Sequence, residues 1–189
     1  MIVVGSIYVF LLFIEKDVVM GLDQYLYKTD IPKEVWDICF NYEGAIKRMF
    51  DGFSHLCDNE KYCFYLRKNY VVDDLLHEYA TIKTFDCVYY YIDKVNAIKI
   101  LEHIIRALKL IPIFYDMDEK ELFKMTENHF MDTIIYNYPT PEKQNDEIRV
   151  RLSHVISGFD IEWDLSGIFG LAKFIYEHPE DNFIYLRSY

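Results

Sequence analysis

"DKVNAIKILEHIIRALKLIP", residues 93–112, has one helical face that is apolar from end to end. Charged side chains occupy the opposite face, and Asp93 and Pro112 are typical of a helix cap and a helix stop. The apolar stripe consists of Ala97, Ile98, Leu101, Ile104, Ile105, Leu108 and Ile111. This periodicity predicts a long amphipathic helix around which the remainder of the chain packs.

Similar periodicities predict helices on both sides of this segment. They cover 32–56, 71–83, a stretch from Asp118 to Ile135, 147–158, and a last segment capped at Asp164 or Ser166 that ends at His178. Inside the last of these, Gly167 and Gly170 are predicted to be close-packing positions. The polar, proline-bearing stretch "PTPEKQNDE" (139–147) is predicted to be a surface loop.

Three short segments depart from the helical pattern: "LDQYLYK" (22–28), "YCFYLRK" (62–68) and "NFIYLRSY" (182–189). Short runs of tyrosine, phenylalanine and isoleucine favour strands, although aromatic loops or helix ends are the alternative. We expect the first segment to pair with the end of the chain, with helices on one face of the sheet. The expected class is α+β and predominantly helical, with about five helices packed on a small tyrosine-rich antiparallel sheet.

Composition supports one well-buried core, since 52% of the 189 residues are apolar and 17% are aromatic. Asp and Glu (31) outnumber Lys and Arg (20), which gives a net charge of −11. Because no run of basic residues could neutralise phosphates, nucleic-acid binding is disfavoured. The charge would steer the chain toward basic partners, and it is also ordinary for an acidic cytosolic protein. Cys39, Cys57, Cys63 and Cys87 are expected to be reduced thiols.

The apolar lead before Met20 has three interpretations. Residues 2–14 carry no charge, but as a helix they would rise only about 20 Å, which is too short to cross a bilayer. They also lack the flanks of a secretory signal. The lead is an interfacial anchor, a packed segment, or upstream codons before a true start at Met20. We favour the last, which divides the chain into a mis-assigned lead (1–19) and a single globular domain (20–189).

The segment "MGLDQYLYK" (20–28) resembles the beginning of a group of small uncharacterised phage and bacterial proteins that start Met-Gly-Leu-Asp-x-Tyr-Leu. "YYIDKVNAIKI" (90–100) is similar to their interior stretch Tyr-Trp-Arg-Lys-x-Asn-Ala-Ile, and "EDNFIYLRSY" (180–189) to their aromatic end. The Trp and Arg of that pattern are replaced here by Ile92 and Asp93. The resemblance implies a start at Met20 and a phage or bacterial cytoplasmic setting, and it carries no activity.

The residues offer little support for catalysis by a metal or a nucleotide. His55, Cys57, Cys63 and His77 are weak metal candidates, because five residues separate the two cysteines and zinc ligands are usually two to four apart. We found no glycine-rich phosphate loop, and no cofactor is expected. The acid pairs that could serve a hydrolase are Asp73 and Asp74, Asp116 and Asp118, and Glu177 and Asp181.

A recognition surface is the leading functional hypothesis. The period of two places Asp23, Tyr25 and Tyr27 on one face of the first strand, and we expect Asn96 of the main helix to share their surface. The sequence thus predicts a non-enzymatic, acidic accessory protein that binds a host or partner protein in the cytoplasm. The alternatives are a small metal-dependent or Cys/His-dependent hydrolase and a membrane-associated effector anchored by residues 1–14.

Overall fold

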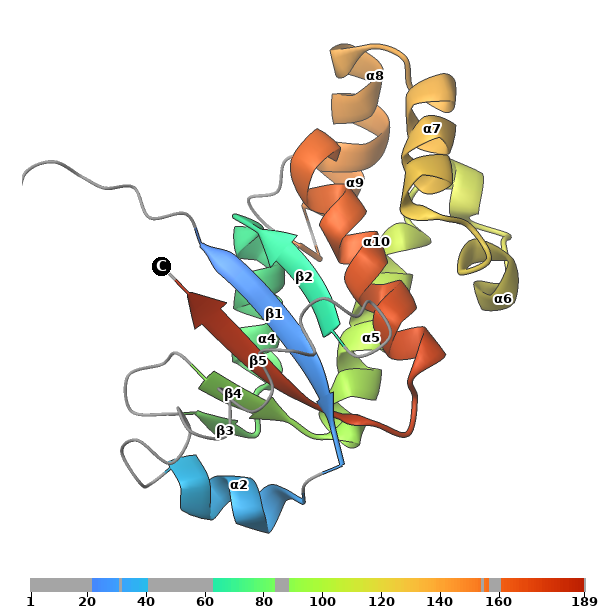
Figure 1. Ribbon diagram of the computed structural model, residues 1–189. Helices are drawn as coiled ribbons and strands as arrows, with labels where there is room; N and C mark the ends of the chain where they lie inside the picture. Colours follow the sequence, from blue (N-terminus) through green and yellow to red (C-terminus); the bar gives the residue numbers. More distant parts are fainter. Residues whose placement is uncertain are drawn as a thin grey trace, which may run out of the picture.

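A five-stranded antiparallel sheet organises the domain (Figure 1). The computed structural model describes residues 22–30, 32–40, 63–83, 89–153, 155–156 and 161–188. The strands are β1 (Asp23–Thr29), β2 (Cys63–Arg67), β3 (Ile82–Lys83), β4 (Tyr89–Ile92) and β5 (Asn182–Ser188). They lie in the order β2-β1-β5-β4-β3, so the first and last described strands are neighbours at the centre. The α+β class is confirmed, as is the pairing of the first strand with the end of the chain.

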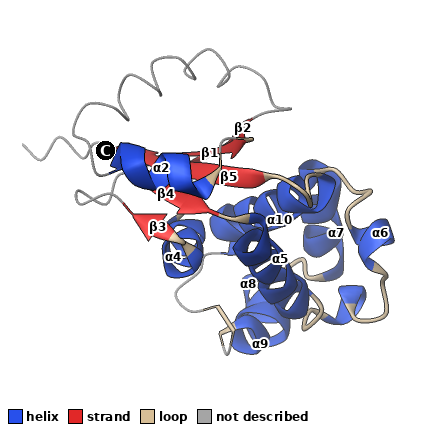
Figure 2. Cartoon of the chain, turned by 90° about the horizontal axis from the view of Figure 1, so that it is seen from below, coloured by secondary structure: helices blue, strands red, loops and turns tan. Residues whose placement is uncertain are grey.

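Three helices pack on one face of the sheet (Figure 2). They are α4 (Tyr70–Tyr79), α5 (Lys94–Leu108) and α10 (Ile161–Glu177). The main helix predicted from the sequence is α5, and its apolar stripe is buried almost throughout. The carboxylate of Asp93 caps it by accepting a hydrogen bond of 2.9 Å from the backbone N–H of Asn96. The turn after α5 leads into the short helix η2 (Pro112–Phe114).

The opposite face of the sheet is also covered, by α2 (Lys33–Phe40) (Figure 2). Trp36 of α2 is fully buried, and its indole N–H donates a hydrogen bond of 3.3 Å to Thr29 Oγ1. It forms a second, smaller core with Tyr27, Cys63, Tyr91 and Ile184. The expectation that helices cover a single face was therefore wrong, because the second face is aromatic and apolar and needs its own cover. The remainder of the helix predicted at 32–56 lies outside the described residues.

One predicted helix is shorter than expected, and another is divided into two helices. The helix predicted at 71–83 ends at Tyr79. Ile82 pairs with Tyr91 in the sheet instead, because the neighbouring strand satisfies the backbone hydrogen bonds that a helix would otherwise make. The helix from Asp118 to Ile135 is divided into α6 (Glu119–Leu122) and α7 (Glu127–Asn137). The break lies at Thr126, whose hydroxyl accepts a hydrogen bond from the backbone N–H of His129 and starts the second helix.

The predicted loop at 139–147 is mostly helical. It contains α8 (Pro141–Gln144) and most of the π-helix η3 (Asn145–Arg149), after which α9 (Val150–Leu152) continues. Thr140 caps this run and Pro141 takes the first turn, where proline is favoured, so these breakers start a helix here. Ile148 and Leu152 are fully buried.

The last helix begins earlier than its predicted caps. It starts at Ile161, so neither Asp164 nor Ser166 caps it, and Asp164 is buried. Its end before His178 is as predicted. Among the described residues, no helix combines the length and the apolar character that crossing a bilayer requires.

Candidate functional site

Asp23, Tyr25 and Tyr27 lie on one face of β1, the face that α2 partly covers. Tyr27 is buried beneath Trp36 and is only 4% exposed. The ring of Tyr25 stacks on that of Tyr27, with 6.1 Å between centroids, and lies 5.0 Å from the ring of Tyr65. Most of the surface predicted here is therefore engaged in packing within the fold.

The exposed end of this face is a small polar cluster. The hydroxyl of Tyr65 donates a hydrogen bond of 2.8 Å to Asp23 Oδ1, and Arg67 Nε lies 3.7 Å from the same oxygen. Burial, with the hydrogen bond to Asp23, raises the pKa of Tyr65 above its ordinary value. Arg67 offsets the charge of Asp23, and the neutral Tyr65 is half exposed.

Asn96 does not share this surface. It lies in the first turn of α5, on the opposite side of the sheet from α2 (Figure 2). Its side-chain amide donates hydrogen bonds of 3.0 Å to the carbonyl of Tyr79 and 3.1 Å to Thr81 Oγ1. Asn96 thus ties the start of α5 to the end of α4.

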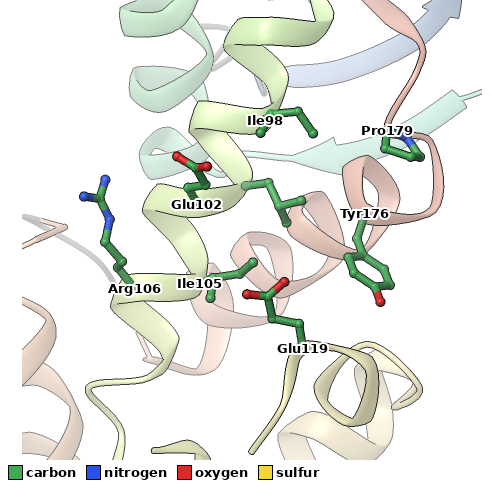
Figure 3. Close-up of a pocket in the computed structure, with 8 residues that line it drawn as sticks. Ile98, Glu102, Ile105, Arg106, Glu119, Tyr176 and Pro179 are labelled. Atoms are coloured by element: carbon green, nitrogen blue, oxygen red, sulfur yellow. The ribbon is translucent and has the colours of Figure 1, made fainter.

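A groove opens between α5 and α10, in a place where the sequence predicted only core (Figure 3). One wall is formed by Ile98, Leu101 and Ile105 of α5, and Tyr176 and Pro179 form the wall across from it. The hollow has a volume of about 740 Å³, which is in the range of ligand-binding sites. We call it the α5–α10 groove.

Charged residues border the α5–α10 groove. Glu102 and Arg106 project from α5, and Glu119 at the start of α6 reaches up beneath Ile105 (Figure 3). Arg106 extends away from Tyr176 and Pro179. Within the described part of the chain, none of these three charges belongs to a recorded ion pair. Glu102 projects on the same side of α5 as Arg106, so Glu119 is the carboxylate that the border offers to a bound molecule (Figure 3).

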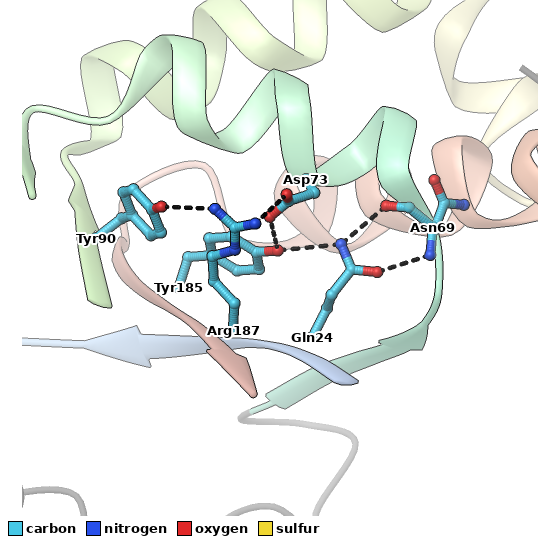
Figure 4. A network of polar contacts seen from close by, with 6 residues as sticks. All are labelled: Gln24, Asn69, Asp73, Tyr90, Tyr185 and Arg187. Carbon is cyan, nitrogen blue, oxygen red and sulfur yellow. Dashed lines mark hydrogen bonds and ion pairs between the residues drawn. The ribbon is translucent and has the colours of Figure 1, made fainter. Parts of the chain in front are cut away.

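A network of polar side chains lies between the sheet and α4, on the other side of β1 (Figure 4). Gln24 Nε2 donates hydrogen bonds of 2.9 Å to the carbonyl of Asn69 and 3.0 Å to the hydroxyl of Tyr185. The Tyr185 hydroxyl donates in turn to Asp73 Oδ1 at 2.6 Å, and Asp73 forms an ion pair of 3.0 Å with Arg187. The sequence signal for this network was a single polar residue, Gln24, on the core face of a strand.

The network shifts two pKa values. Burial, with the adjacent carboxylate of Asp73, raises the pKa of Tyr185 far above its ordinary value. Burial alone would lower the pKa of Arg187, but a hydrogen bond of 3.0 Å to Tyr90 and the Asp73 carboxylate outweigh it, and the net pKa is raised. Tyr185 therefore stays protonated and Arg187 charged, as a structural joint between β1, β5 and α4 requires.

The predicted acid pairs do not converge on a common point. Asp118 caps α6, accepting a hydrogen bond of 2.7 Å from the backbone N–H of Glu121, while Asp73 faces Arg187. Glu177 pairs with Lys173 at 3.2 Å and Asp181 with Lys28 at 3.0 Å. Each of these four carboxylates thus has its own structural partner within the fold.

The described half of the predicted metal cluster is divided by the sheet. Cys63 is buried in the small core under α2, whereas His77 of α4 packs on Tyr90, with 5.3 Å between ring centroids. His55 and Cys57 lie outside the described residues. Among the residues that the structure describes, no group of three His, Cys, Asp or Glu side chains could hold a metal ion.

No family model, curated protein or solved structure matches this chain.

Proposed function

We propose that this chain is a non-enzymatic accessory protein of a phage or bacterial cytoplasm that acts by binding another protein at the α5–α10 groove. One observation carries the proposal: an apolar hollow of about 740 Å³ is open at the surface between helices. Covering this apolar wall would favour association, because it removes apolar surface from water. Apolar side chains of a partner would supply that cover.

The walls of the groove are held in place by the core beneath them. Ile104 and Leu108 of α5, and Phe169 and Ala172 of α10, are fully buried. A partner therefore meets walls that need little ordering, which leaves more of the contact energy for affinity. The β1 face is a weaker candidate, because Tyr27 lies beneath Trp36.

The test is a selection of peptides from a random 16-residue display library on the purified chain. We expect recovered peptides to bind the wild type and to lose at least tenfold in affinity for Ile98→Asp. Ile98 is half-buried in the groove wall and packs against the edge of the large core, so a carboxylate there would oppose an apolar guest, and circular dichroism checks that the variant stays folded.

Val95→Asp is the matched control, because Val95 is an exposed apolar residue of the same helix that does not line the groove. Its affinity for the peptides should equal that of the wild type. The docking proposal is wrong if the library yields no binder, or if both variants bind the recovered peptides as well as the wild type does.

A further inference from the structure

We infer that the occupant of the α5–α10 groove is an amphipathic helix bearing basic side chains, an inference that rests on the docking function proposed above. It follows from the spacing of the apolar wall, from the secondary structure of the lining and from the charges on the border.

The apolar wall on α5 has helical spacing. Ile98, Leu101 and Ile105 stand at positions i, i+3 and i+7, which span about 10 Å along the axis at 1.5 Å per residue. A guest helix that matches this length presents about two turns, with apolar residues at i, i+3 or i+4, and i+7. Tyr176 and Pro179 bound its far side.

The lining favours a helical guest over an extended one. Its described residues belong to α5, α6, α10 and the turn that follows α10, and none belongs to a strand. An extended peptide would therefore find no strand edge to pair with, and its backbone N–H and C=O groups would face apolar walls. A helix satisfies these groups internally and offers the groove only side chains.

The charges on the border favour basic side chains. Glu119 lies beneath Ile105, Glu102 stands on α5, and neither belongs to a recorded ion pair among the described residues. Glu102 and the single cation of the lining, Arg106, project on the same side of α5, away from the opposite wall, which leaves Glu119 as the carboxylate that a guest would meet (Figure 3). The net charge of −11 would attract the same partner from a distance.

Three labelled 16-residue peptides test the inference by fluorescence anisotropy at 0.15 M salt. The first is a helix with leucine at the matching positions and lysine elsewhere. The second replaces its lysines by glutamate, and the third carries two central prolines that prevent the helix. We expect the basic helix to bind at least tenfold more tightly than either of the others, and Ile98→Asp to weaken it at least tenfold.

Charge variants separate local recognition from general attraction. Glu119→Lys should weaken the basic helix about tenfold, whereas Glu142→Lys, the same charge change at an exposed position of α8, should have a much smaller effect. The inference is overturned if the basic helix does not bind, if the acidic or proline peptide binds equally well, or if the two variants weaken binding equally. If the library peptides still lose affinity for Ile98→Asp, the docking function stands whichever of these results is found.

Discussion

Tyr185 shows how one buried hydroxyl can join three elements. Its oxygen accepts a hydrogen bond from Gln24 of β1 and donates one to Asp73 of α4, while the residue itself belongs to β5. Ionisation would place a phenolate beside the Asp73 carboxylate in a buried site, so both burial and charge repulsion keep the proton in place. The joint therefore depends on protonation, and the dependence is measurable.

We expect the free energy of unfolding to fall as the pH rises above about 10. In that range tyrosine loses its proton in the unfolded chain, whereas Tyr185, with its raised pKa, keeps it in the folded chain. Unfolding then releases a proton, which costs the fold about 1.4 kcal/mol per pH unit for this group. Urea denaturation at several pH values from 8 to 11 measures the slope.

Tyr185→Phe is the control for this slope. At pH 8 the variant should be less stable by about 1 to 2 kcal/mol, because it loses hydrogen bonds while Asp73 keeps Arg187 and Gln24 keeps Asn69. That difference should shrink above pH 10, because phenylalanine does not titrate. A difference that stays constant up to pH 11 would show that Tyr185 ionises normally in the folded chain.

At the scale of elements, the sequence predicted the helices and strands whose apolar residues form a recognisable pattern. The stripe of α5 was predicted correctly because the helix has one polar and one apolar face, and the strands at both ends of the domain were predicted from their short aromatic and apolar runs. The strand β4 was missed, since Tyr90 faces the large core and Tyr91 the small one, and both are buried. A strand covered on both faces has no polar alternation to show.

The α5–α10 groove could not be predicted for a related reason. Ile98 and Ile104 belong to the same sequence stripe, yet Ile104 is fully buried and Ile98 is only half-buried beside the hollow. Periodicity tells which residues avoid water, and it does not tell how much of the stripe its neighbours cover. The extent of that cover is set by how α10 and α6 are placed, which depends on the whole fold.

The glycines of α10 were predicted to be close-packing positions, and the packing around Gly167 confirms it. A Cβ atom there would lie 2.2 Å from Nδ2 of Asn69, the residue that caps α4 through its contact with the backbone N–H of Val72. We expect Gly167→Ala to lower the free energy of unfolding by about 1 to 3 kcal/mol, because the displaced cap outweighs the better helix propensity of alanine. Thermal and urea denaturation measure the change.

Gly170→Ala is the matched control on the same helix. An added Cβ atom there would lie 2.6 Å from the carboxylate end of the exposed Glu127 side chain, which can move aside, and 3.0 Å from Cε2 of Phe64, whose ring would have to shift slightly. This variant should lose less stability than Gly167→Ala, because no helix cap is displaced and alanine has the better helix propensity. Equal losses in the two variants would mean that α10 tolerates no added methyl group and that the Asn69 cap is not the cause.

At the scale of the whole molecule, one sheet separates two cores of unequal size. The large core joins α4, α5, α7 and α10 to one face, and the small core is built around Trp36 on the other. The small core anchors one described helix, α2, whereas the large core holds the walls of the α5–α10 groove. The groove should therefore keep its shape when α2 is released.

Trp36→Ala tests this separation. Removing the indole takes away a fully buried side chain that joins α2 to the small core, so the amides of Lys33–Phe40 should exchange with deuterium much faster. Amides of α5 and α10 should stay protected, because their contacts lie on the other face. Phe169→Ala is the counterpart in the large core, where Phe169 stacks on Phe130 at 4.2 Å, and it should weaken protection in both layers. If Trp36→Ala exposes α5 as much as α2, the two cores unfold as one unit and the groove is coupled to the opposite face.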